Sequence, residues 1–187
     1  LPGIRRVVVV PYLRGGEDIS GIRGAVSWEQ FAASTSHSTP LPFEQLPFDH
    51  PLYIMYSSGT TGLPKCLVHG RGGTLLQHLK EHVLHGDLRR DDRLFYFTTC
   101  GWMMWNWLVS GLAVGCTIVL YDGAPLLRRR PILWDMAAGE RITTFGTSAK
   151  FLALAEKEEL RPGETHDLSA LTTILSTGSP LAPQSFD

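Results

Sequence analysis

The chain has 187 residues, of which 43% are hydrophobic and 19% are charged, and its formal net charge is −1. This composition is typical of a globular chain with a sizeable core. The balanced charge gives no electrostatic reason to expect nucleic acid or an anionic membrane as a partner. The three cysteines, Cys66, Cys100 and Cys116, are an odd number without CxxC spacing. They indicate reduced thiols in a cytoplasmic protein, and neither a disulfide framework nor a zinc site.

The segment before residue 46 contains signals for one strand and one short helix. A run of valines in residues 5–13 predicts a buried strand, and Pro11 should end its regular pairing. Ser27 and Gln30 have the spacing of a capping box, which predicts a helix that begins after Ser27. Residues 34–42 are rich in Ser, Thr and Pro and should form a surface connection. We therefore expect residues 1–45 to be the end of one α/β subdomain with its connection, and residues 46–187 to form a second α/β subdomain.

The stretch from residue 56 to residue 65, Tyr-Ser-Ser-Gly-Thr-Thr-Gly-Leu-Pro-Lys, is the most distinctive part of the chain. Apolar, β-favouring runs at residues 52–55 and 67–68 predict that one short buried strand enters it and a second leaves it. Its polar groups are the hydroxyls of Ser57, Ser58, Thr60 and Thr61, the glycines Gly59 and Gly62, and the cation of Lys65. Glycine backbone can approach a ligand closely, and exposed N–H groups beside a lysine form a concave site for an anion. A plain polar turn has no need of so many donors and a lysine, so the pattern favours a phosphate-binding loop over that alternative.

Residues 73–88 carry apolar side chains at helical spacing and predict the longest helix of the chain. His78, His82 and His85 follow one another four and three residues apart and therefore share one face of this helix. Two histidines at such spacing can bind zinc. The glutamate that follows the first histidine in metalloprotease helices is absent, however, and the alternative of a solvated polar stripe is preferred. No metal site is predicted.

A second unusual stretch lies at residues 101–107, Gly-Trp-Met-Met-Trp-Asn-Trp, where a predicted apolar helix begins that continues to residue 115. This helix is too short to span a bilayer, which needs about twenty apolar residues. Large aromatic and methionine side chains are commonly core residues, but rigid aromatic walls with deformable methionines also form small-ligand pockets. Both alternatives stay open here, and Asn106 is the polar group that a pure core would not need.

Strands and helices alternate through the remainder of the chain. Strands are predicted at residues 94–98, 117–121, 143–146 and 173–176, and helices at residues 132–138 and 148–160, the latter capped by Ser148. This order predicts an α/β fold with a doubly wound, mostly parallel sheet and helices on both faces. Ligands bind beyond the carboxyl ends of strands in such sheets, and the loop, residues 102–106 and residues 177–180 all follow predicted strands, so one crevice can collect all three. The basic residues 128–130 are interpreted as a solvated loop, with a contact to an anionic cofactor as the alternative.

Residues 57–65 match the Ser/Thr- and Gly-rich loop of the adenylate-forming superfamily, which includes the acyl-CoA synthetases. Residues 101–107, 120–123 and 174–181 extend this resemblance along essentially the whole chain, toward the branch of the superfamily that activates acetoacetate. The resemblance implies a piece of the large N-terminal domain, with residues 46–187 as an ATP-binding subdomain. It implies a reaction in which ATP, with Mg²⁺, and acetoacetate give acetoacetyl-AMP and pyrophosphate, after which coenzyme A displaces AMP to form the thioester.

The resemblance also implies roles for individual residues. Ser57, Ser58, Gly59, Thr60, Thr61, Gly62 and Lys65 correspond to the loop that holds the β- and γ-phosphates, with Lys65 as the catalytic cation. Gly178, Ser179 and Pro180 correspond to the segment that lies against the adenine. Trp102, Met103, Met104, Asn106 and Thr177 correspond to the region of the acyl pocket. Acetate-activating relatives have a Gly-His pair where this chain has Trp105-Asn106, which argues against acetate as the acid.

Later elements of the superfamily are not found before Asp187. They are a Glu-bearing turn for Mg²⁺, an aspartate for the ribose hydroxyls and a C-terminal catalytic lysine. The chain is therefore expected to be a fragment, inactive alone, whose partner is the remainder of the same polypeptide. The alternatives are a nucleotide-binding module without catalysis and an adenylation domain for another carboxylic acid. A sheet cut in this way should expose large apolar side chains on one face or have that face covered by another chain.

Overall fold

The computed structural model describes residues 3–12, 18–33, 40, 42–57, 62–126 and 131–186. The chain divides into two compact units, Leu1–Gln45 and Leu46–Asp187. The predicted phosphate-binding residues Ser58, Gly59, Thr60 and Thr61 lie outside the described residues, as do the basic residues 128–130.

The first unit contains a two-stranded parallel sheet and one short helix. Strand β1 (Val7–Val9) pairs with β2 (Ala25–Ser27), and helix α1 (Trp28–Ala33) follows directly. The predicted capping box is confirmed. The Gln30 N–H donates to Ser27 Oγ at 3.2 Å, and the Ser27 N–H donates to Gln30 Oε1 at 3.1 Å. Strand β1 is shorter than the strand predicted over residues 5–13 and is half-buried. It ends before Pro11, which has no N–H to donate to a partner strand.

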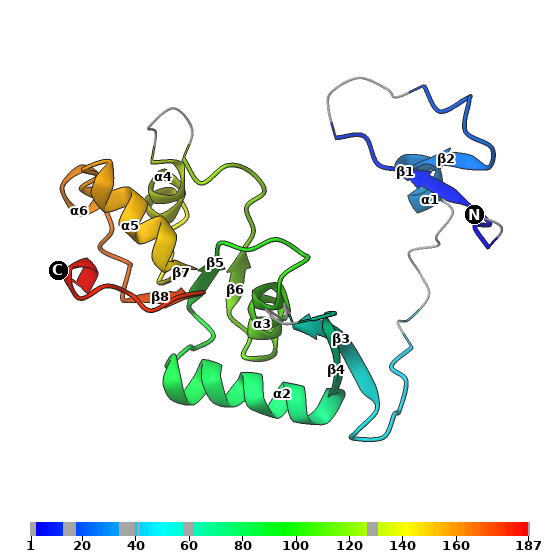
Figure 1. Ribbon diagram of the computed structural model, residues 1–187, viewed down its shortest axis with the longest axis horizontal. Helices are drawn as coiled ribbons and strands as arrows, with labels where there is room; N and C mark the ends of the chain where they lie inside the picture. Colours follow the sequence, from blue (N-terminus) through cyan, green and yellow to red (C-terminus); the bar gives the residue numbers. More distant parts are fainter. Residues whose placement is uncertain are drawn as a thin grey trace. The chain divides into compact units, whose positions relative to one another are not determined.

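Strands β3 (Pro51–Ser57) and β4 (Lys65–Gly70) form an antiparallel hairpin in the second unit (Figure 1). The two strands were predicted, but the expectation that they are buried is wrong. Ile54 and Tyr56 are 58% and 70% exposed, whereas Met55 and Ser57, on the alternate face, are half-buried. The hairpin pairs with no third strand in the described part of the chain, so its outer face carries exposed apolar side chains.

The larger sheet has four strands in the order β6-β5-β7-β8, and its neighbouring strands all pair in parallel. These strands are β5 (Arg93–Tyr96), β6 (Thr117–Val119), β7 (Thr144–Ser148) and β8 (Thr173–Thr177). Helices separate them along the chain (Figure 1), which confirms the predicted α/β fold with a mostly parallel sheet. Because the strands run the same way, their carboxyl ends meet at one edge of the sheet.

Helices pack on both faces of this sheet, as alternate residues of β5 show. Phe95 points to one face, where it joins a buried cluster with Trp134 of α4 (Ile132–Gly139) and Phe151 of α5 (Ala149–Lys157). Leu94 and Tyr96 point to the opposite face. There they join a second buried cluster with residues of α3 (Met103–Ser110).

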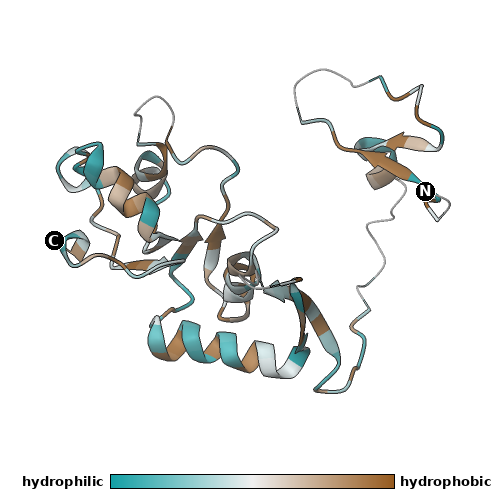
Figure 2. Ribbon diagram, viewed as in Figure 1, coloured by the Kyte–Doolittle hydropathy of each residue, from teal (hydrophilic) through white to brown (hydrophobic). Residues whose placement is uncertain are grey.

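Helix α2 (Arg71–Lys80) continues into the π-helical turn η1 (Glu81–His85), so a helix is found where residues 73–88 predicted one. Hydrophobic and hydrophilic colours alternate along α2 in Figure 2. The apolar side chains do not face the core, however, since Leu76 and Leu84 are 60% and 75% exposed. The polar side of this segment faces α3 instead.

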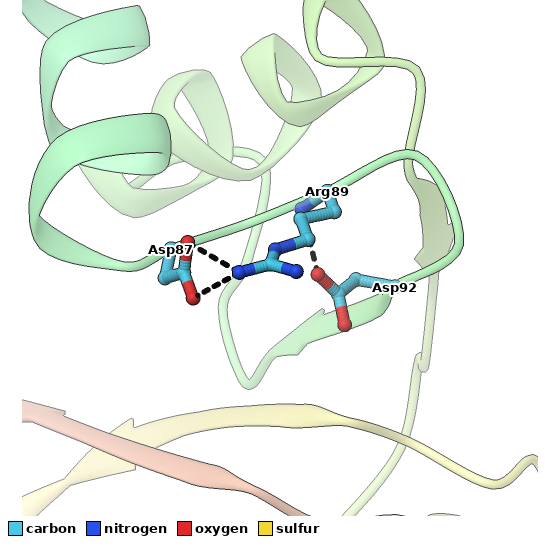
Figure 3. Close-up of polar contacts among 3 residues, drawn as sticks. All are labelled: Asp87, Arg89 and Asp92. Atoms are coloured by element: carbon cyan, nitrogen blue, oxygen red, sulfur yellow. Dashed lines mark hydrogen bonds and ion pairs between the residues drawn. The ribbon is translucent and has the colours of Figure 1, made fainter.

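The turn from η1 into β5 is built by a small polar cluster (Figure 3). The Arg89 N–H donates to Asp92 Oδ2 at 2.6 Å, and the Arg89 guanidinium lies 3.0 Å from the Asp87 carboxylate. The other carboxylate oxygen of Asp92 accepts from Thr143 Oγ1 at 2.8 Å, which ties the turn to the start of β7. The exposed ion pair contributes little, so the turn is held mainly by the Asp92 bonds.

The remaining helical segments are short. They are η2 (Gly111–Ala113), α6 (Pro162–Thr165) and η3 (Pro183–Phe186). The predicted cap of α5 is confirmed, because the Phe151 N–H donates to Ser148 Oγ at 3.2 Å. No helix in the described part of the chain has the length and apolarity needed to cross a lipid bilayer.

Candidate functional site

The hairpin brings the two ends of the predicted phosphate loop together. Ser57, the last residue of β3, is the register partner of Lys65, the first residue of β4. Lys65 is exposed, and no carboxylate of the described residues forms an ion pair with its ammonium group. At Gly62 an added Cβ would meet nothing within 4 Å, so the space beside the backbone is open. A cation without an ion-pair partner among the described residues, at the point where two paired strands meet, suits an anion.

Helix α3 begins shortly after the carboxyl end of β5 with an uncapped N-terminus. Trp102 occupies the N-cap position with extended backbone, and no described side chain accepts a hydrogen bond from the first turn. The N–H groups of Met103 and Met104 therefore retain partial positive charge and can stabilise a carboxylate that approaches them. The Trp102 ring meets Tyr96 edge to face, with centroids 6.2 Å apart.

The predicted acid-binding residues of α3 do not all face one space. Met103 lines a hollow of about 470 Å³ that is bounded by residues of β4, α2 and α3. Trp105 lines a second hollow, of about 410 Å³, at the ends of β5 and β6. Met104 packs half-buried against the buried cluster that contains Tyr96 and Trp107. Core packing therefore applies to Met104, whereas Met103 and Trp105 border open space. Trp107 does both, since it belongs to the buried cluster and also lines the first hollow.

Asn106 connects α3 to the strand that leads into the loop. Its Nδ2 donates to the Sδ of Met55 at 3.3 Å. Met55 lies two residues before Ser57 on the half-buried face of β3. Strand β3, which leads into the loop, and helix α3 are thus joined by a direct contact.

The third predicted segment follows β8. Thr177 ends the strand and is half-buried, whereas Ser179 and Pro180 are exposed. Gly178 has a φ of 95°, a backbone conformation that side chains other than glycine rarely adopt. Strand β7 lies between β8 and β5, so the ends of β8 and β5 are about 10 Å apart at the usual strand spacing. This segment shares the carboxyl edge of the sheet with the start of α3.

His82 is buried, so the expectation of a solvated histidine stripe is wrong for this residue. Its side chain is 0% exposed, and its Nε2 lies 3.0 Å from the Trp107 carbonyl oxygen and 2.9 Å from Ser110 Oγ. The imidazole also packs against the Trp107 indole, with centroids 4.1 Å apart. Burial lowers the pKa of the His82 imidazole, which favours its neutral form. His78 is half-buried, and only His85 of the three is exposed.

Glu81 adds a second link between η1 and α3. Its Oε2 accepts from Trp107 Nε1 at 2.9 Å, and its Oε1 accepts from Gln77 Nε2 at 2.6 Å. The sequence pattern missed the contacts of His82 and Glu81 with α3, because Trp107 and Ser110 lie on that helix more than twenty positions away. Histidines and a glutamate on one helical face were a signal of polarity, but not of burial.

Metal ligands are not apparent in the described ranges. No group of three or more His, Cys, Asp or Glu side chains there could hold a metal ion. We therefore assign no metal ligand.

A parallel α/β sheet with a Ser/Thr/Gly/Lys segment between two strands and an uncapped helix at its carboxyl edge is the arrangement of an α/β protein of the nucleotide-binding kind. The chain belongs to the AMP-binding enzyme family, which matches residues 14–187. It is a homologue of acetoacetyl-CoA synthetases. That of Danio rerio is 55% identical over 192 residues, which cover 100% of this chain and 28% of the relative.

Two further proteins extend the comparison. The solved acetoacetyl-CoA synthetase from Streptomyces lividans superimposes on 100% of this chain with a TM-score of 0.85 and 45% identity, over 28% of its own length. The malonamoyl-CoA synthetase of Penicillium aethiopicum is 43% identical, over 100% of this chain and 28% of that relative. The chain thus spans about 28% of the length of the relatives that it matches.

Proposed function

We propose that the chain takes part in the ATP-dependent activation of acetoacetate as acetoacetyl-AMP and in its transfer to coenzyme A. The observation that carries the proposal is the identity of 55% with an acetoacetyl-CoA synthetase along the whole chain. Lys65, which has no ion-pair partner among the described residues, and the uncapped start of α3 support it, because both would supply positive charge to the anionic substrates. Residues 46–187 would form an ATP-binding subdomain, and the rest of a polypeptide of the relatives' length would complete the site. The cysteines of this chain are free thiols, which is consistent with the proposal of a cytoplasmic enzyme.

The proposed first step needs no nucleophile from the protein. A carboxylate oxygen of acetoacetate forms a bond to the α-phosphorus of ATP, and the bond from that phosphorus to the pyrophosphate oxygen breaks. Lys65 and the loop between Ser57 and Lys65 would stabilise the charge that develops on the departing pyrophosphate. Interactions that strengthen in the transition state in this way lower the activation free energy most. In the second step the thiol sulfur of coenzyme A attacks the acyl carbon and AMP leaves. Gly178–Pro180 would lie against the adenine. No step is assigned to Mg²⁺, because the described residues offer it no ligand set.

The acid-binding region would include Trp102, Met103, Met104, Asn106 and Thr177, and would select acids with a carbonyl at carbon 3. Acetoacetate and malonamate, the acids that the names of two relatives imply, share this carbonyl and differ only by methyl against amino at its far side. A site that donates a hydrogen bond to such an oxygen rejects an analogue without it by more than a purely apolar pocket can.

The test is ATP–pyrophosphate exchange by the full-length polypeptide with acetoacetate, malonamate, butyrate or acetate. The proposal expects exchange with acetoacetate, and little with butyrate, which has the same chain length but no carbonyl at carbon 3. It also expects release of AMP when coenzyme A is added. Nucleotide binding without exchange would indicate a non-catalytic module, and a stronger response to another acid would indicate a different adenylation enzyme.

A further inference from the structure

We propose that His82 is a positioning residue for the acid. Together with Glu81 it locks Trp107, and thereby fixes α3 so that the predicted acid-binding residue Met103 stays at a set place relative to β3, the strand that enters the phosphate loop. This inference rests on the proposed function, since it concerns the same site.

Trp107 is held at two points by consecutive residues of η1. His82 Nε2 lies 3.0 Å from its carbonyl oxygen, and Glu81 Oε2 accepts from its indole Nε1 at 2.9 Å. A contact to the backbone and a contact to the side-chain tip together fix both the rotation of α3 about its axis and its position along it. The Ser110 hydroxyl, which donates to the same carbonyl at 2.6 Å, closes the network one turn further on.

The locked residue is directly coupled to the acid-binding region. Met103 lies four positions before Trp107, so the two side chains share one face of α3 and border the same hollow. Asn106, the neighbour of Trp107, bonds Met55 on the strand that enters the phosphate loop. Any rotation of α3 would therefore move Met103 and strain the contact with β3 at the same time.

The chemistry of His82 argues against a role in packing alone. Its Nδ1 is buried and has no hydrogen-bond partner among the described residues, which is a cost that an apolar side chain of similar volume avoids. In the Nε2–H tautomer, the His82 imidazole donates a hydrogen bond to the Trp107 carbonyl oxygen. The π-helical turn that contains His82 also supports a functional role, because such turns are rare in general and frequent at functional sites.

The experiment compares His82→Leu, His82→Gln and the control His85→Leu in a polypeptide of the relatives' full length. Glutamine can place its amide nitrogen where the imidazole Nε2 lies, whereas leucine fills the space without a donor. His85 lies on the same turn but is exposed and outside the network. The readouts are kcat/KM for acetoacetate and for butyrate, the KM for ATP, and the thermal midpoint of unfolding.

We expect His82→Leu to lower the acetoacetate-to-butyrate ratio of kcat/KM by about tenfold, because misplacement of a binding group by ~1 Å can reduce rates by up to about 100-fold. The KM for ATP should stay within about twofold, since the loop itself is intact. His82→Gln should restore most of the ratio, and His85→Leu should leave it unchanged.

An unchanged ratio in a folded His82→Leu enzyme, even with a lower thermal midpoint, would overturn the inference and leave His82 a structural residue. Equal losses in His82→Gln and His82→Leu would overturn it as well. If His82→Leu does not fold, Trp107→Phe decides, because it removes the indole N–H that Glu81 accepts, together with part of the bicyclic ring, and keeps an aromatic ring at this position. It should lower the same ratio. Absence of exchange with acetoacetate in the unaltered enzyme would instead refute the proposed function.

Discussion

Gly146 is the position at which one added methyl group should disturb both the sheet and the candidate site. It lies in β7 as the register partner of Tyr96 in β5. A Cβ at this position would lie 2.1 Å from Cδ2 and 2.6 Å from Cγ of the Tyr96 ring. Tyr96 is 3% exposed and its hydroxyl donates to the Thr147 carbonyl oxygen at 3.1 Å. The ring can therefore not swing away without losing a buried hydrogen bond.

The cost follows from these distances. The ring has to retreat from 2.1 Å to at least the 3.4 Å at which ordinary van der Waals contact begins. Overpacking of this kind costs about 1–3 kcal/mol, and loss of the Tyr96–Thr147 bond adds about 1–3 kcal/mol for the buried hydroxyl left without a partner. We expect Gly146→Ala to lower the free energy of unfolding by about 2–6 kcal/mol.

Gly73→Ala is the matched control. A Cβ at Gly73, within α2, would meet nothing within 4 Å. The same chemical change should raise stability there by about 0.5–1 kcal/mol, because alanine favours the helix. Urea unfolding of the full-length polypeptide, followed by far-ultraviolet circular dichroism, compares the two variants. In a Tyr96→Ala background Gly146→Ala should lose most of its effect. Equal effects of the two glycine substitutions, or a penalty that persists without the Tyr96 ring, would refute the reasoning.

Four further outcomes are expected. Lys65→Ala should lower acetoacetate-dependent ATP–pyrophosphate exchange about 10- to 100-fold with the thermal midpoint unchanged, because a charge-assisted contact to the leaving group is lost; unchanged exchange would remove Lys65 from the site. Met103→Ala should favour acids one methylene longer by about 1–3 kcal/mol in relative kcat/KM, because Met103 lines the hollow beside α2, and an unchanged preference would remove Met103 from the acid-binding region. Ser148→Ala should lower the free energy of unfolding by about 1 kcal/mol in the same urea assay, through loss of the α5 cap; no change would show that the bond to Phe151 contributes nothing. The free energy of unfolding should fall as the pH drops below 6.5, since the pKa of His82 is lowered in the folded chain and the unfolded chain therefore binds the proton first. The urea midpoint of His82→Gln should depend less on pH than that of the unaltered chain, and an identical dependence would contradict this.

Features with a local physical cause could be predicted from the sequence. The caps at Ser27 and Ser148 depend only on residues three positions apart, and both hydrogen bonds are present. The alternation of strands and helices was sufficient for a parallel sheet, because parallel neighbours need a crossover between them. The two strands on either side of the loop were likewise visible in two apolar runs, although their antiparallel pairing as a separate hairpin was not predicted.

Features that depend on distant partners could not be predicted. The spacing of the apolar residues in α2 indicates a helix with an apolar stripe, but not which side of it meets α3. The choice is made by Trp107 and Ser110, whose polar groups pair with His82 and Glu81. The exposure of Ile54 is a similar case, because a strand pattern shows that a side chain can be buried and not that a partner is there to bury it.

The order of residues in the first turns of α3 explains why they seemed to fit both a core and a pocket. Successive helical residues point about 100° apart, so five in a row face every side of the helix. Met103 borders the hollow beside α2, Met104 packs against the buried cluster, and Trp105 borders the hollow at β5 and β6. Asn106 contacts strand β3, and Trp107 contacts the turn η1. Each of these neighbours needs a large or specific side chain, which accounts for the density of tryptophan and methionine. Of these five side chains, Met103, Trp105 and Trp107 border a hollow, and Trp107 is only 8% exposed and held by η1. Met103 and Trp105 are therefore the two of the five that can be varied to alter acid selectivity without first loosening the helix that carries them.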